Sequence, residues 1–319
     1  MINTFWQNIG FVFRCVWLSV LMAVAGGVGA RSSERGVNSV EHSVTDSEGV
    51  LPGIFSVSGK MKVRFSKGNL QYYPLTRTWR FALNQWDLVG IGDDVDVVND
   101  NYVVGNVAGS DNREIADDYD GWIDLFGWGT GGKPACQSTF YSDYSVFTDW
   151  GVNAISNGGD EKGEEYRTLS YDEWFYLLSR RKKANEKFAV AMVCGVNGVV
   201  LLPDIWMQPE GVDFRSGTAY QDDWRHFLIV NNYDADEWKK MEDAGAVFLP
   251  AAGYRRGKSV MGVGKTCFCW TSDAYDIDDM FCFFAIANGV YVDYGYCANG
   301  LSVRLVKECE SSKFLKKKK

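Results

Sequence analysis

The chain has 319 residues, a formal net charge of −8 and 46% hydrophobic residues. This length is sufficient for one large core, and the acidic balance argues against nucleic-acid binding, which needs clustered Lys and Arg. The chain has only two histidines, His42 and His226, so a Ser-His-Asp triad, a Cys-His dyad or a histidine-rich zinc site has almost nothing to be built from. Its 12 Trp, 16 Tyr and 19 Phe fit an exported binding scaffold, because aromatic residues dominate recognition surfaces.

Residues 1–30 predict a secretory signal peptide. Arg14 is their one charged residue, an apolar run follows from Cys15 to Val28, and the run ends in small residues before Ala30. The run of about 14 residues is short for a membrane span, which needs about 20. We therefore expect export to the periplasm, the cell surface or the medium, with membrane contact only if this segment stays uncleaved.

The cysteines predict no metal site. Cleavage after Ala30 would remove Cys15 from a total of eight cysteines, and the odd remainder means that at least one is unpaired or intermolecular. Export permits disulfides, and the sequence leaves their pairing open. Because no Cys-x-x-Cys spacing or neighbouring histidine occurs, no zinc pattern is present, and we predict neither a metal nor a cofactor.

Residues 31–53 are rich in Ser, Val and Glu and predict a flexible linker. The folded domain is then expected over residues 54–308, followed by a basic, disordered tail over 309–319 that carries Lys313 and Lys316 to Lys319. Hydrophobic alternation and turn residues predict strands over 54–57, 61–65, 71–73, 78–82, 188–194, 198–202, 246–249 and 301–306.

Residues 92–120 are acidic and rich in Asn. Asp and Asn oxygens suit Ca²⁺, but the full Asp-x-Asp-x-Asp-Gly loop with its terminal Glu is absent. The spacing therefore favours a long solvated loop over a calcium site.

Two helices are predicted from capping boxes. Ser170 and Glu173 begin a helix from Tyr171 to about Arg181, whose apolar face carries Trp174, Leu177 and Leu178. Asp234 and Glu237 begin the second helix, in which Trp238 and Met241 face the core and Gly245 ends the helix. Short strands with two helices and many turns indicate an α+β fold.

Seven segments, in order, resemble exported Bacteroidota domains related to the Fibrobacter major paralogous domain family. They are KVRFSKGNLQYYPLTRTWRFALNQWD, DGWIDLFGWGT, DWGVNAISNGG, YRTLSYDEW, GVNGVVLLPD, AGAVFLPAAGYRRG and GLSVRLV. The YRTLSYDEW and GLSVRLV segments also resemble the formylglycine-generating enzyme branch of the C-type lectin architecture. The resemblance implies a C-type-lectin-like, loop-rich core of mixed strands with two flanking helices, in which the first and last strands pair.

The resemblance stops at the chemistry. Formylglycine-generating enzymes use a C-terminal cysteine pair, but Cys267, Cys269, Cys282 and Cys297 lack that family's local context. The Glu-Pro-Asn, Gln-Pro-Asp and Trp-Asn-Asp motifs of calcium-dependent lectins are also missing. We therefore expect a non-catalytic binding protein, with an enzyme related to formylglycine generation and a structural or adhesin subunit as alternatives.

Residues 266–299 contain no Lys, Arg, Glu or Gln. Some proteins that this chain resembles are targets of diversity-generating retroelements, which randomise adenines in Asn codons near the C-terminus. Asn codons so altered can encode Phe, Tyr, Cys, Asp, Ala, Val, Ile, Ser, Thr, Gly, His, Arg, Leu or Pro, but never Lys, Glu, Gln, Met or Trp. Only Trp270 and Met280 in the segment fall outside the permitted residues, so its composition is typical of a diversified region.

Rigid aromatics with small polar residues are also the composition of antibody paratopes. On a strand, Cys282, Phe284 and Ile286 share one face while Phe281, Phe283 and Ala285 share the other. One face would complete the core and the other would bind a protein or glycan; the alternative is a hairpin packed within the domain, with its cysteines as small apolar residues. The predicted ligand-binding residues are Phe268, Asp273, Tyr275, Asp276, Asp278, Asp279, Cys282, Phe284, Ile286, Tyr291, Asp293, Tyr294, Tyr296 and Cys297.

Overall fold

The computed structural model describes residues 49–89, 94–99, 102–107, 119–159, 161–217, 231–257, 259–286 and 289–309, with the backbone alone for 94–99 and 102–107. The predicted signal peptide, residues 31–48 of the predicted linker, both histidines and the terminal lysines lie outside these residues.

Strands in small sheets make up most of the regular secondary structure of the described residues. The strands are β1 (Phe55–Ser56), β2 (Lys62–Phe65), β3 (Leu70–Tyr73), β4 (Thr78–Phe81), β5 (Asp94–Asn99), β6 (Tyr102–Val107), β7 (Tyr166–Arg167), β8 (Phe188–Val193), β9 (Val196–Leu201), β10 (Asn232–Tyr233), β11 (Val247–Pro250), β12 (Tyr254–Arg256), β13 (Ser259–Met261), β14 (Cys267–Ala274), β15 (Asp279–Ile286), β16 (Gly289–Tyr296), β17 (Asn299–Gly300) and β18 (Val306–Glu308). The helices are α2 (Tyr171–Phe175), continued by a π-helical stretch (Tyr176–Arg180), and α3 (Ala235–Asp243), with 3₁₀ turns at Tyr141–Tyr144 (η3), Trp150–Val152 and Ala184–Glu186.

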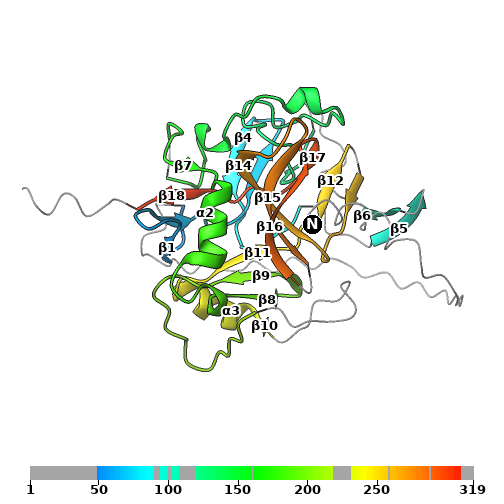
Figure 1. Cartoon of the computed structure of the whole chain (residues 1–319). Helices are drawn as coiled ribbons and strands as arrows, with labels where there is room; N and C mark the ends of the chain where they lie inside the picture. The colour runs from blue at the N-terminus through cyan, green and yellow to red at the C-terminus, as the bar shows by residue number, and fades with distance from the viewer. Residues whose placement is uncertain are drawn as a thin grey trace, which may run out of the picture.

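This is the mixed α+β organisation that the sequence predicts, with two short α-helices among the described residues. Figure 1 shows α2 in front of the β14–β15–β16 sheet, and α3 beside the β10–β8–β9–β11 sheet. The strands predicted on either side of Pro74 pair as the β3–β4 hairpin, and the strands predicted over 188–194 and 198–202 pair as the β8–β9 hairpin.

The first and last parts of the domain meet in one sheet, with strand order β1–β2–β18–β7. Antiparallel pairing sets Val306 opposite Phe65 and Glu308 opposite Val63, and Val306 also pairs with Arg167. The expected pairing of N-terminal and C-terminal strands is therefore found between β2 and β18, while β1 pairs with β2. This pairing closes the domain because β2 and β18 both contribute buried residues to one core.

Both predicted helix starts are confirmed. Ser170 and Glu173 form a capping box, and so do Asp234 and Glu237. The predicted apolar faces are buried, including Trp174 and Leu177 in the first helix. Gly245 ends α3 with a φ of +98°, a left-handed conformation that favours glycine at a helix end.

Four predicted segments differ from the structure, namely the linker, the C-terminal tail, the acidic loop and the strand over 301–306. Part of the predicted linker packs on the domain, since Leu51 is buried and its N–H donates to the Phe65 carbonyl. At the other end, the Cys309 N–H donates to the Lys62 carbonyl, so the predicted tail is joined to the domain at its first residue.

The predicted acidic loop contains the β5–β6 hairpin, and its remaining residues up to 118 lie outside the described structure, so the calcium interpretation stays there too. Residues 301–305 are not a regular strand; they are held by single bridges such as Phe126 to Leu301 and Cys269 to Ser302, before β18 begins. Their backbone bonds go to three different segments, at Phe126, at Trp270 and at residues 66–70, rather than to one neighbouring strand. Alternation in sequence cannot distinguish this arrangement from a strand.

The β14–β15–β16 meander separates two hydrophobic cores. Cys267, Cys269, Phe283 and Ala285 belong to a core shared with α2 and β1–β2. Phe268, Trp270, Cys282, Phe284 and Cys297 belong to a second core shared with the β3–β4 hairpin. Because successive side chains on a strand point to opposite faces, β15 is buried on both faces.

Candidate binding surface

The turn between β14 and β15 carries the most exposed residues of the segment 266–299. The N–H groups of Tyr275 and Asp276 both donate to the Asp279 carbonyl at 2.9 Å, which closes the turn. Tyr275 is 51% exposed and Ile277 is 68% exposed. Apolar residues this exposed at the tip of a closed turn are available for contact with another molecule.

A row of aromatic rings begins at this turn and runs towards α2. The rings of Tyr275 and Tyr294 stack with centroids 4.4 Å apart and an interplanar angle of 6°. Tyr275 then meets Phe281 edge-on at 5.2 Å. The row continues from Phe281 to Tyr171 at 4.2 Å and from Tyr171 to Phe175 at 6.0 Å. Mutual packing holds these partly exposed rings in fixed positions.

Hydrogen bonds fix the helical end of this row to the sheet. The Tyr171 N–H at the start of α2 donates to Oδ2 of Asp273 at 2.7 Å. The Arg167 guanidinium donates two hydrogen bonds of 2.7 Å each to the carboxylate of the capping residue Glu173. This bidentate geometry is stronger than a single hydrogen bond. Asp273, a predicted ligand-binding residue, therefore positions α2, which removes one of its oxygens from ligand binding.

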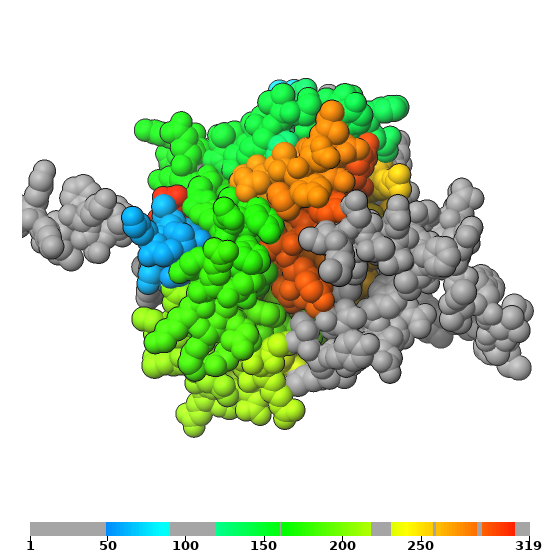
Figure 2. All heavy atoms as spheres, viewed as in Figure 1, coloured from blue at the N-terminus to red at the C-terminus, as the bar shows by residue number. Residues whose placement is uncertain are grey.

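A second segment adjoins the turn on its other side. Phe140 is 72% exposed and Tyr141 is 43% exposed, at the start of η3. The Cys297 N–H donates to the Asp278 carbonyl at 2.8 Å, and the Cys297 thiol lies 3.9 Å from the Tyr141 carbonyl oxygen. Figure 2 shows the hairpin, in orange, between α2 in green and the segment around η3 in bluish green.

We call this surface the recognition face. It consists of Phe140, Tyr141, Tyr275, Asp276, Ile277, Asp278, Asp279, Tyr294 and Tyr296. Tyr296 joins its two parts, because its hydroxyl donates to the Thr139 carbonyl at 3.0 Å. The face therefore combines rings, one exposed aliphatic side chain and three carboxylates.

The carboxylates of this region are partly withdrawn from water. Burial raises the pKa of Asp279, and repulsion by Asp278 and Asp276 raises it further. Burial also raises the pKa of Asp293, which accepts a hydrogen bond from the Tyr294 N–H at 3.0 Å. Half-buried carboxylates in a turn are costly unless a donor or cation satisfies them.

Four predicted ligand-binding residues belong to the core instead. Phe268, Cys282, Phe284 and Cys297 are buried at 7%, 0%, 4% and 0% exposure. The expectation of one buried and one exposed face on β15 is wrong, because a second core covers the other face. The Ile286 side chain lies outside the described structure. Tyr291 is 47% exposed, but it contacts Phe284 rather than the row of rings.

The structure adds residues that the sequence did not indicate. Phe140, Tyr141 and Ile277 are exposed beside the predicted residues, while Tyr171 and Phe281 extend the row of rings. Phe140 and Tyr141 stand out as adjacent aromatics in the polar stretch QSTFYSDYS, which is the signal that could have identified them. Nothing in the sequence shows that this stretch lies beside residues 275–278.

The four cysteines of the segment 266–299 are buried and pack in the two hydrophobic cores. Burial raises the pKa values of the Cys267 and Cys282 thiols, and it raises that of Cys297 to about 11. A reactive cysteine needs the opposite, a lowered pKa and partial exposure. None of the seven described cysteines is joined in a disulfide, and the described residues hold no cluster of three His, Cys, Asp or Glu that could bind a metal.

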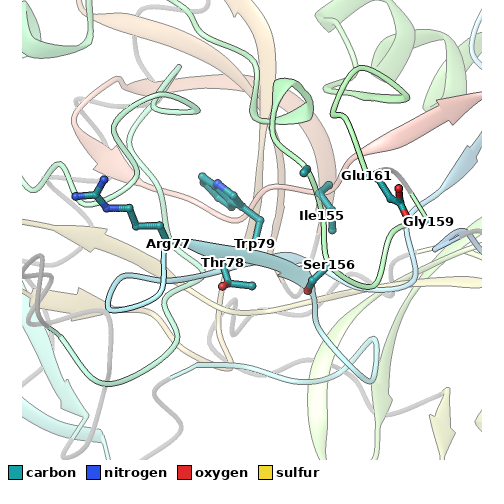
Figure 3. Close-up of a pocket in the computed structure, with 8 residues that line it drawn as sticks. Arg77, Thr78, Trp79, Ile155, Ser156, Gly159 and Glu161 are labelled. Atoms are coloured by element: carbon teal, nitrogen blue, oxygen red, sulfur yellow. The ribbon is translucent and has the colours of Figure 1, made fainter.

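A hollow of about 580 Å³ lies between β4 and residues 154–161, and it shares no lining residue with the recognition face. Figure 3 shows Arg77 at one end of its lining and Glu161 at the other. Its lining residues Trp79 and Ile155 are part of the second core. The hollow contains no cysteine and none of the predicted ligand-binding residues, so it supports neither the enzyme alternative nor the predicted site.

No family model matches the chain, and no curated protein or solved structure matches it significantly. In the part of the chain that the structure describes, no helix has the length and apolar character needed to cross a membrane.

Proposed function

We propose that this protein is an exported or cell-surface, non-catalytic binding protein that contacts its ligand through the recognition face. The observation that carries the proposal is the row of fixed, partly exposed rings from Tyr294 through Tyr275 to Tyr171. Rigid aromatic side chains supply contact area with little loss of conformational entropy, which is why they dominate paratopes. The N-terminal sequence supports export.

The proposal includes the C-type-lectin-like fold and diversification of the C-terminal segment. The composition of residues 266–299 supports diversification. Altered codons at the exposed turn would change side chains that do not pack in a core. The gene's downstream sequence tests this part directly. A near-repeat of the segment's codons, with adenines where the gene differs, is the expected finding, and the absence of any such repeat would overturn diversification.

Binding itself is tested with a glycan array and a displayed random-peptide library, using the whole chain as bait. We expect a bound glycan or peptide whose affinity falls at least about tenfold in Tyr275→Ala and in Phe140→Ser, as for truncated interface anchors. The matched control is Ile205→Ser, because Ile205 is 85% exposed and lies outside the face. Binding that is equally sensitive to the control, or insensitive to both face variants, contradicts the proposal.

A further inference from the structure

The turn of the recognition face holds carboxylates that form no ion pair with any residue that the structure describes. In the part of the chain described here, the side chains of Asp278 and Asp279 have neither an ion pair nor a hydrogen bond. Asp276 accepts a single hydrogen bond, at 2.7 Å, from the neighbouring Ile277 N–H. Three acidic residues are thus crowded into one turn, and two of them, Asp278 and Asp279, are half-buried.

The described residues around the turn do not neutralise this charge. Residues 266–299 contain no Lys or Arg. The positive charge of Arg256 on β12 partly offsets the rise that burial causes in the pKa of Tyr296. The pKa of Asp279 is nevertheless raised, by burial and by the neighbouring Asp278 and Asp276. A cation brought by another molecule would relieve this repulsion, because opposite charges attract strongly where water is partly excluded.

The rings beside these carboxylates restrict the kind of cation. Tyr275 is half-exposed and stacked on Tyr294, and a guanidinium group binds favourably over such a ring. Ile277 and Phe140 offer apolar contacts that suit the aliphatic stem of a long basic side chain. A bare metal ion would use the carboxylates alone and leave the rings without a role.

We propose that the recognition face binds an Arg- or Lys-bearing segment of a partner protein, with the cationic head at Asp276, Asp278 and Asp279 and the stem against Tyr275 and Ile277. This inference rests on the proposed function, since it names the partner class of the same surface. It favours a protein over a glycan, because neutral sugars would not compensate the carboxylates.

The test selects peptides from a displayed random 12-residue library on the whole chain at low salt, in the presence of EDTA. A second selection uses the triple variant Asp276→Asn/Asp278→Asn/Asp279→Asn. A third uses Asp213→Asn/Asp236→Asn/Asp243→Asn, which changes the net charge equally at exposed positions outside the face.

We expect the peptides selected on the unmodified chain and on the control variant to be enriched in Arg and Lys, and those selected on the turn variant to lose this enrichment. Individual basic peptides should bind the turn variant about tenfold more weakly and should weaken as salt rises. Enriched peptides that are neutral or acidic, or basic peptides that bind all three chains equally, would overturn the inference.

The two proposals fail in different ways. Peptides that depend on Tyr275 but not on the three aspartates would contradict the basic partner and leave the binding function standing. Peptides that depend on neither would contradict the binding function itself. Peptides that are enriched only when the selection is repeated with Ca²⁺ in place of EDTA would replace the basic partner with a metal-dependent ligand.

Discussion

Two parts of residues 266–299 have the same unusual composition and opposite environments. Phe283 and Cys282 on β15 are completely buried, whereas Tyr275 and Ile277, a few residues earlier, are exposed at the turn. The difference comes from position in the sheet: β15 is the central strand between two cores, while the turn projects beyond both. A segment can thus contain scaffold and recognition residues together, so composition alone cannot tell them apart.

The largest expected effect separates these two parts by stability. Phe283 is fully buried and its ring lies 4.8 Å from that of Trp174, so Phe283→Ala should lower the free energy of unfolding by about 3–5 kcal/mol. Tyr275→Ala should cost only about 1 kcal/mol, because the two aromatic contacts that it removes, with Phe281 and Tyr294, are partly exposed. Urea unfolding of both variants measures the contrast, and equal losses would show that the turn is core as well.

A second prediction concerns the buried hydrogen-bond network around Gln85. Gln85 accepts hydrogen bonds from the Arg304 guanidinium and the Phe248 N–H, both at 2.7 Å, and donates to Glu242 at 2.7 Å. Burial lowers the pKa of Arg304 to about 10, so the buried guanidinium cation depends on its few hydrogen-bond partners for stabilisation. Gln85→Ala should therefore cost about 3 kcal/mol by leaving buried donors unpaired.

The neighbouring residue is the matched control for that experiment. Asn84 is exposed and hydrogen-bonds only within its own turn, to Asp87. Asn84→Ala should cost less than about 1 kcal/mol. A Gln85 variant no less stable than the Asn84 variant would mean that the buried network contributes nothing measurable.

The smallest expected effect is a pH dependence of the turn. The pKa of Asp279 is raised in the folded protein, so its protonated form favours folding at low pH, and this contribution is lost as the pH rises through the folded pKa. At neutral pH the ionised carboxylate therefore destabilises the fold, and Asp279→Asn should stabilise it by a few tenths of a kcal/mol.

That gain should disappear near pH 3, where Asp279 is protonated in both states. Thermal unfolding of Asp279→Asn and the unmodified chain at the two pH values measures it. Asp236→Asn, at an exposed position on α3, serves as the control. Stabilisation of the same size at both pH values would contradict the electrostatic explanation.

Local signals in the sequence predicted the local structure well. The capping boxes at Ser170 and Asp234 place both helices because every partner lies within three residues. The strands of the β3–β4 and β8–β9 hairpins follow from alternation within each segment in the same way.

Long-range partners could not be predicted. Gln85 gives no periodic signal, yet its partners Phe248 and Arg304 lie 163 and 219 residues further along the chain. For the same reason the sequence placed Phe284 and Cys282 on the surface, since the core that covers them comes from β3, β4 and residues 123–128. Phe140 and Tyr141 could not be assigned to the face from the sequence, because only the folded structure brings them close to the β14–β15 turn.

The central claim is that the exposed part of residues 266–299 recognises a ligand while the buried part maintains the fold. Sequencing this segment of the gene from many independent isolates tests it most directly. We predict that differences between isolates concentrate in the codons of residues 275–279, 294 and 296, and are rare at Trp270, Cys282, Phe283 and Phe284. Differences spread evenly over both parts, or confined to the buried part, would contradict the account.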